Sequence, residues 1–164
     1  MRPAVILALL AAVVLAACGG SSSHSKSTSA AAGPTKAQFV AQADPICAAA
    51  KRRAPTKRLL ALIGQFPTPT QEIVRLLRRT TPVVKDAVRQ LSAVPPPAAD
   101  RAAIARWISQ IAAIGVLTGK AADQLAGGDL AAAVKTYTDI TANAIDPVDF
   151  AKGYGLHACS SIVG

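Results

Sequence analysis

Proline clusters divide this sequence into segments that carry the apolar periodicity of α-helices. The clearest segment lies between Thr68-Pro69-Thr70-Gln71, which can supply an N-cap, a first-turn proline and a capping box, and the stiff connector Val94-Pro95-Pro96-Pro97. Pro82 lies off its apolar stripe. The inward positions of this second predicted helix are Ile73, Leu76, Leu77, Thr80, Val84, Ala87, Val88 and Leu91. A sequence in which prolines separate helical segments predicts a fold of several packed helices.

Small apolar side chains dominate the composition. Hydrophobic residues make up 51% of the chain and aromatic residues only 4%, and alanine supplies much of the difference. Small residues at this density favour close-packed helices, and no convincing alternating run of β-branched residues indicates a strand. We therefore expect an all-α fold, a four-helix up-and-down bundle stapled by a disulfide, with a looser array of helical hairpins as the alternative.

The first helix is expected to begin after Thr35 as N-cap. Pro45 lies within it and should kink or restart it. After a basic stretch that ends at Pro55, the helical pattern continues from Thr56 to Phe66. The face that this first helix should bury consists of Phe39, Ala43, Cys47 and Ala50.

Two more helices are predicted in the second half. The third runs roughly from Ala98 to Ala126 and ends at Gly127-Gly128, and Asp129 caps the fourth. Asp146-Pro147 is expected to form a turn or a helix-end cap. The third helix should present Ile104, Trp107, Ile108, Ile111, Gly115, Leu117, Ala121 and Leu125 to the core. The fourth should present Leu130, Val134, Tyr137, Ile140, Ala144 and Val148.

The N-terminus has the pattern of an export signal. An apolar run from Ala4 to Ala17 follows Arg2 and is shorter than the roughly 20 residues that a spanning helix needs. Its end, Leu15-Ala16-Ala17-Cys18, looks like the bacterial lipobox, in which the cysteine thiol receives diacylglycerol and the chain is cut before it. We expect residues 1–17 to be a lipoprotein signal peptide and Cys18 to be the lipidation site. An ordinary secretory signal with an incidental cysteine is the alternative.

Lipidation predicts the rest of the organisation. Residues 19–34 are mostly Gly, Ser, Ala, Thr and Pro, too polar and small-sided to form a core. We therefore expect residues 18–34 to be a disordered, flexible tether and residues 35–164 to be the helical domain. The expected location is the cell envelope, on the extracytoplasmic face of the membrane.

Two cysteines, Cys47 and Cys159, remain after Cys18 is assigned to lipid. An even pair in an oxidising compartment favours a disulfide. The start of the first helix and the end of the fourth also lie at the same end of an up-and-down bundle. Two free thiols or a metal pair are the alternatives, and both lack supporting ligands.

A set of motifs spans most of the mature chain. Besides the lipobox and the tether, it consists of Phe39 with Ala43-Asp44-Pro45-Ile46-Cys47-Ala48-Ala49-Ala50, a proline-rich break before the Trp107 helix, Gly127-Gly128-Asp129-Leu130 and Gly155-Leu156-His157-Ala158-Cys159. Together these motifs resemble a group of small alanine-rich actinobacterial lipoproteins of unknown function. The resemblance implies a helical domain stapled by its two cysteines, and no activity. Pro45 departs from the pattern, because such a helix would be expected to run on there.

Residue types that catalysis or metal binding would need are scarce. Glu72 is the single glutamate, which in practice excludes a ferritin-like carboxylate site. Of the two histidines, His24 lies in the tether and His157 near the C-terminus, and neither belongs to a metal-binding pattern. Ser160 and Ser161 beside His157 suggest a nucleophile, but a disulfide-pinned tail is the simpler account. We expect no cofactor, no metal and no enzymatic activity.

Charge is the unusual surface feature. Residues 36–99 carry eleven Lys and Arg against three acidic residues, whereas residues 100–164 carry five against six. The basic half predicts contact with anionic lipid headgroups, acidic envelope polymers or an envelope protein, and ordinary solvated faces are the alternative. The candidate contact residues are Lys51, Arg52, Arg53, Lys57, Arg58, Arg75, Arg78, Arg79, Lys85 and Arg89.

The sequence therefore favours a lipid-anchored extracytoplasmic binding or interaction module of the envelope, without specifying its task. The alternative is a carrier that holds a small apolar ligand inside the helical bundle. Nucleic acid is a poor candidate partner, because the address is extracytoplasmic and stacking aromatics are scarce. Nothing in the pattern indicates an oligomeric state.

Overall fold

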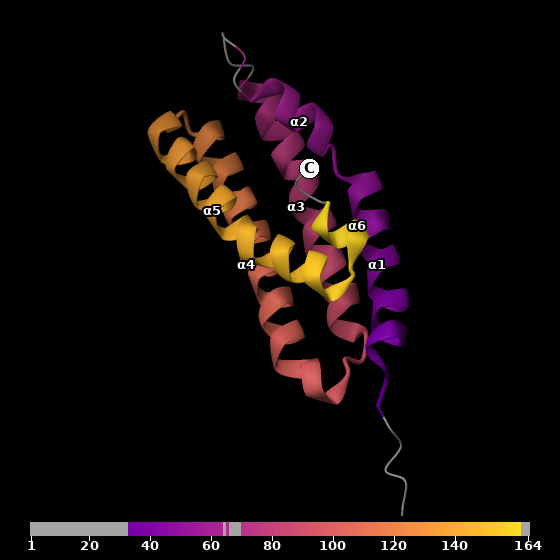
Figure 1. The fold of residues 1–164 in the computed structure, drawn as a ribbon. Coiled ribbons are helices and arrows are strands. Elements are labelled where there is room, and N and C mark those ends of the chain that lie inside the picture. The colour runs from indigo at the N-terminus through magenta and orange to yellow at the C-terminus, as the bar shows by residue number, and fades with distance from the viewer. Residues whose placement is uncertain (1–32, 64, 66–69, 162–164) are drawn as a thin grey trace, which may run out of the picture. The chain divides into compact units, whose positions relative to one another are not determined.

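A computed structural model describes residues 33–63, 65 and 70–161 (Figure 1). The regular secondary structure of these residues consists of helices, without a strand, which confirms the all-α prediction for them. The elements are α1 (Lys36–Arg53), α2 (Thr56–Leu62), α3 (Thr70–Ala93), the 3-10 turn η1 (Ala98–Asp100), α4 (Arg101–Ala126), α5 (Leu130–Tyr154) and α6 (His157–Ser160). The predicted signal peptide, the lipobox, nearly all of the tether, Phe66 and the Thr68-Pro69 capping signal lie outside the described residues.

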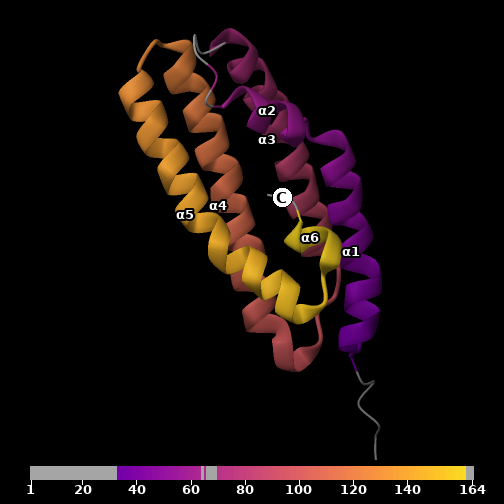
Figure 2. The same cartoon turned by 45° about the horizontal axis from the view of Figure 1, so that its top comes forward.

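The packing order follows the chain until the last short helix. α3 packs on α4 and α4 packs on α5, while α1 packs on α3. α6 contacts both α5 and α1 and lies between them (Figures 1 and 2). A helix of four residues therefore separates two long helices that would pack directly against each other in a closed four-helix bundle.

The predicted start and inner face of α1 are confirmed. The Gln38 N–H donates to Thr35 Oγ1 at 3.2 Å, and the Thr35 N–H donates to Gln38 Oε1 at 2.8 Å, which together form a capping box. All four residues of the predicted inner face are buried. Of the two effects predicted for Pro45, a kink or a restart, the restart is wrong, because α1 is one unbroken element. Proline removes the donor to the carbonyl of Ala41, and Ala41 is exposed, so water can take that hydrogen bond.

The second predicted helix, α3, has nearly the expected inner face. Pro82 is exposed, as predicted, and Val83 is buried where Val84 was expected. Val84 instead faces α4, where a Cβ added to Gly115 would lie 2.9 Å from Val84 Cγ1. Gly115 therefore allows α3 and α4 to approach closely. The predicted positions that are buried are Ile73, Leu76, Leu77, Ala87 and Leu91.

The junction between α4 and α5 agrees with the predicted capping residues. Gly128 has a φ of 80° and closes α4, and the N–H of the next residue, Asp129, donates to the Gln124 carbonyl at 2.9 Å. Asp129 Oδ1 then accepts from the Ala132 N–H at 3.0 Å and caps α5. In contrast, α2 ends at Leu62 and not at Phe66, because Ile63 has extended backbone angles.

The inner face predicted for α5 is wrong over its first half. Three residues placed inside, Leu130, Val134 and Tyr137, are exposed by 57%, 57% and 38%. The residues that α5 buries are mostly small: Ala133, Thr136, Ala144, Pro147, Ala151 and Tyr154. Small side chains allow α5 to pack closely on α4, whereas a stripe of larger residues beside them is left uncovered.

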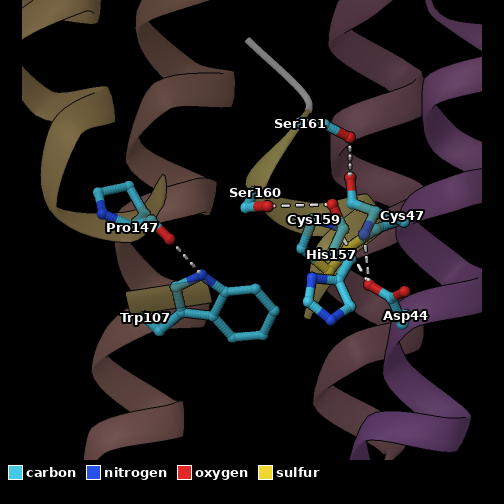
Figure 3. Close-up of a disulfide and its surroundings, with 9 residues drawn as sticks. Asp44, Cys47, Trp107, Pro147, His157, Cys159, Ser160 and Ser161 are labelled. Carbon is cyan, nitrogen blue, oxygen red and sulfur yellow. Dashed lines mark hydrogen bonds between the residues drawn. A yellow bond between two sulfur atoms is a disulfide. The ribbon is translucent and has the colours of Figure 1, made fainter. Parts of the chain in front are cut away.

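The expected turn at Asp146-Pro147 is also wrong, because both residues lie inside α5. Pro147 is buried, and its carbonyl accepts a hydrogen bond from Trp107 Nε1 of α4 at 3.0 Å (Figure 3). The helix ends instead at Gly155, whose φ of 90° allows the Leu156 N–H to reach the Ala151 carbonyl at 2.8 Å.

Among the described residues, the segment Ala98–Ala126 is long and apolar enough to cross a membrane by length and composition alone. The core helix of a soluble domain meets the same criteria. α4, which makes up most of this segment, packs between α3 and α5. Of the apolar window in this segment, 22% is buried inside the fold.

Candidate functional site

A cross-link and a capping interaction hold α6 against α1. Cys47 and Cys159 form a disulfide with their Cα atoms 4.9 Å apart, and both residues are buried. One turn before Cys47, Asp44 Oδ1 accepts hydrogen bonds from the N–H groups of Ala158 at 2.7 Å and Cys159 at 3.3 Å (Figure 3). These contacts fix the short helix that keeps α1 and α5 apart.

An apolar pocket, called here the seam pocket, lies where α1 and α5 are held apart. It has a cavity volume of about 90 Å³. One wall is formed by Ala50, Ala54 and Thr56, and the opposite wall by Ala144 and Val148. The floor and the α6 end are formed by Thr80, Val83, Val84, Ala87, Trp107, Ile111, Ile114, Pro147 and Cys159.

The interior of the seam pocket offers almost no free polar group. The Thr80 hydroxyl donates to the Leu76 carbonyl at 2.9 Å, so the side chain uses its donor within α3. The indole N–H of Trp107 is bonded to the Pro147 carbonyl. Lys51 is the charged residue at the rim, and its Nζ donates to Ser161 Oγ at 2.9 Å. The pocket therefore combines a mainly apolar interior with a single cation at its edge.

Exposed apolar side chains continue from the seam pocket along α5. Leu130, Tyr137 and Thr141 recur at helical spacing from the pocket-lining Val148, so they share its face of the helix. Val134 and Ile145 flank this line and are 57% and 61% exposed. We call these residues the α5 stripe: Leu130, Val134, Tyr137, Thr141 and Ile145.

The structure does not bring the ten predicted contact cations together on one surface. Five of them, called here the α3 basic face, are exposed on one helix and point away from its pocket-lining residues: Arg75, Arg78, Arg79, Lys85 and Arg89. Arg53 and Arg58 lie beside this face, because they pair with Asp86 and Glu72 of α3. Arg52 and Lys57 are exposed but make no ion pair among the described residues. Lys51 lies apart, at the rim of the seam pocket.

Few carboxylates neutralise the α3 basic face. Asp86 accepts from Arg53 at 2.6 Å and from Arg89, and Arg78 reaches Asp123 of α4 at 3.5 Å. The hydrogen bond from Arg53, and then that from Arg89, lowers the pKa of Asp86 from 3.8 to about 2. Because this pKa is lowered on folding, the stabilising contribution is complete above pH 4 and is lost as the pH falls through about 2. Arg75, Arg79 and Lys85 make no ion pair among the described residues.

The other candidate chemistry is accounted for by local bonding. Ser160 Oγ donates to the His157 carbonyl at 3.0 Å, and Ser161 Oγ donates to the Ala158 carbonyl at 3.1 Å. Neither hydroxyl is bonded to the imidazole. Within residues 33–63, 65 and 70–161, no group of three or more His, Cys, Asp and Glu side chains is placed to hold a metal ion.

Sequence reasoning missed the seam pocket, the α5 stripe and the separate position of Lys51. The sequence signal that could have indicated the α5 stripe is the wide apolar face of the Leu130–Tyr154 segment. This face carries two adjacent stripes, one of small side chains and one of large side chains. No protein-family model, no curated protein and no solved structure matches this chain.

Proposed function

We propose that this protein is a lipid-anchored binding module of the cell envelope that contacts an anionic surface through the α3 basic face. The observation that carries the proposal is the gathering of five exposed cations on one helix, three of them without an ion pair among the described residues. Each Lys or Arg near an anionic membrane contributes about 1 kcal/mol of attraction. A membrane-anchored domain meets such a surface at high local concentration, so modest attraction per residue is sufficient.

The anchor in this proposal is lipid on Cys18, and the domain is the helical region from residue 35 onward. Contacts of α1 with α3, α3 with α4 and α4 with α5 support the four-helix up-and-down arrangement as part of the proposal. The favoured partner is anionic phospholipid, with an acidic envelope polymer or an envelope protein as the other partner classes. Catalysis is not part of the proposal.

Cys18→Ser is expected to release the protein from the membrane fraction, because it removes the thiol that would carry the lipid. The measurement is the distribution of the full chain between membranes and medium, together with the mass of the purified protein. A retained membrane fraction and an unchanged mass would contradict lipidation at this residue. Cys47→Ser in a parallel strain is the control, since it also removes a thiol but leaves the lipobox intact.

Reversing Arg75, Arg78 and Arg79 to Glu is expected to weaken binding to anionic vesicles about 100-fold or more at low salt, at about 1 kcal/mol for each cation lost. Binding is measured by co-sedimentation with phosphatidylglycerol vesicles in the Cys18→Ser background, so that acylation does not dominate. High salt should abolish the difference.

The matched control reverses three exposed cations elsewhere, Arg106, Lys135 and Lys152, and changes the net charge equally. This control should lose much less binding if the α3 basic face is the contact. Equal losses in the two variants would mean that only net charge matters. Unchanged binding of the α3 variant would show that α3 does not contact the vesicle.

A further inference from the structure

We infer that the seam pocket binds the alkyl chain of a single-chain anionic lipid, with the lipid's acidic head group at Lys51 Nζ. This site is separate from the α3 basic face, because α3 lines the pocket with the side of the helix opposite to its exposed cations. The inference therefore does not depend on the proposed surface contact.

The size of the pocket indicates a thin occupant. A helix has a diameter of about 10 Å including side chains, which a pocket of 90 Å³ between two helical walls does not admit. An engineered apolar cavity of about 150 Å³ holds benzene, so 90 Å³ is suited to a few methylene groups. Alanines on both walls, at Ala50, Ala54 and Ala144, leave the space into which these groups would fit.

The α5 stripe gives the rest of the chain a path. From Val148 to Leu130 the helix rises about 27 Å at 1.5 Å per residue, which is the length scale of an extended long acyl chain. The stripe leaves four large apolar side chains between 38% and 61% exposed on one helix. On the opposite side of the seam, Leu60 of α2 lies one turn beyond the pocket-lining Thr56 and is 43% exposed. Covering these residues with alkyl chain removes apolar surface from water.

The charge at the rim selects the head group. Lys51 is the charged residue that lines the pocket, and its bond among the described residues is to the neutral hydroxyl of Ser161. Its ammonium group can therefore pair with a carboxylate or phosphate without breaking an ion pair. Because the described lining offers few polar groups besides the Thr56 hydroxyl, the specificity comes mainly from one cation beside an apolar pocket.

Trp107 makes this inference directly testable, because it lines the pocket and is the single tryptophan of the chain. Bromine atoms on a bound acyl chain quench tryptophan fluorescence on contact. The full chain is reconstituted in unbrominated phosphatidylcholine vesicles and titrated with 9,10-dibromostearic acid. We expect saturable quenching by the acid and weaker binding of its uncharged methyl ester. No saturable quenching by either compound would overturn the inference.

Two pairs of variants locate the effect. Ala54→Phe fills the pocket and should abolish quenching, whereas Ala142→Phe, on the exposed side of α5, should leave it unchanged. Lys51→Glu should weaken binding of the acid roughly tenfold, the scale of a charge-assisted bond, but not binding of the ester, and Lys135→Glu should affect neither. Equal behaviour within each pair would contradict the assignment.

The source of the alkyl chain is tested in a separate arm. Vesicles that contain dibrominated phosphatidylcholine, with no fatty acid added, should leave Trp107 unquenched, because the inference specifies a single-chain lipid. Quenching in this arm, with or without quenching by the fatty acid, would overturn it. Since Lys51→Glu changes only an exposed residue, that pair remains informative if Ala54→Phe fails to fold, which helical circular dichroism will reveal. The α3 variant with Arg75, Arg78 and Arg79 reversed should quench normally, so failure of the surface proposal and failure of this one are distinguishable.

Discussion

Removal of the Cys47–Cys159 cross-link is expected to lower the free energy of unfolding by about 4 kcal/mol. The two cysteines are 112 residues apart, and closing a loop of that length removes conformational entropy worth about 4 to 5 kcal/mol from the unfolded chain. Asp44 still caps α6 after reduction, so the native contact is largely kept and the loss reports mainly the greater freedom of the unfolded chain.

The measurement is urea unfolding followed by helical circular dichroism. The untreated chain is compared with the same chain in reductant and with the double variant Cys47→Ala and Cys159→Ala. The reduced chain and the double variant should unfold at similar urea concentrations, because both lose the same cross-link. A loss below about 1 kcal/mol in both would contradict the entropic argument. A large loss in the variant alone would instead point to packing around these buried residues.

The helices that sequence reasoning placed well are those whose signals are local. The Thr35 cap, the buried face of α1 and the ends at Gly127-Gly128 and Asp129 each depend on a few neighbouring residues. Proline misled the reasoning twice, at Pro45 and Pro147, because a helix can pass through a proline when packing on its other faces maintains it. Propensity describes the isolated helix, whereas tertiary contacts determine the outcome.

The candidate site could not be predicted in the same way. The segment after Asp129 carries a small-sided stripe through Ala133 and Ala144 beside a large-sided stripe through Leu130 and Tyr137. Choosing the larger residues as the inner face is reasonable for an isolated helix, but close packing on α4 requires the smaller ones. Which stripe stays exposed also depends on α6, whose position is set by a disulfide and by Asp44 from a distant segment. Residue spacing contains no information on that geometry.

The basic surface shows a similar division. The excess of cations in residues 36–99 is visible in the sequence, and their placement along one face of α3 follows from helical spacing. The position of Lys51, apart from that face, does not follow from helical spacing, because it depends on where α1 meets α6. The same ten residues therefore support two kinds of contact, one broad and electrostatic and one local at the rim of an apolar pocket.

Trp107→Ala is expected to destabilise the fold by about 3 to 5 kcal/mol, the range for removing a large aromatic side chain from a core. Trp107 is 1% exposed and packs against Phe150, with ring centroids 5.7 Å apart. Phe150 stacks on Tyr154, which in turn meets Phe39 of α1 edge-on. Four of the six aromatic side chains of the chain thus form one connected cluster that joins α4, α5 and α1.

Tyr154 shows how enclosed this cluster is. Its hydroxyl donates to Asp100 Oδ2 at 2.5 Å, and burial, together with that bond, raises the pKa of Tyr154 well above its ordinary value. The phenol is therefore protonated at neutral pH. The aromatic cluster has no titration of its own near neutral pH, so the stability lost in a Trp107 variant reports packing and the bond to Pro147, without a contribution from Tyr154 ionisation.

Two further variants divide the Trp107 effect. Trp107→Phe keeps most of the ring volume but removes the indole donor to the Pro147 carbonyl, so its loss should be about 1 to 2 kcal/mol. Tyr137→Ala, a deletion of an aromatic ring that is 38% exposed, should cost less, roughly 1 to 2 kcal/mol. Urea unfolding followed by circular dichroism ranks the three variants without relying on the lost tryptophan signal. If Tyr137→Ala proved as costly as Trp107→Ala, the α5 stripe would be covered in the folded protein. The exposed path beside the seam pocket would then not exist.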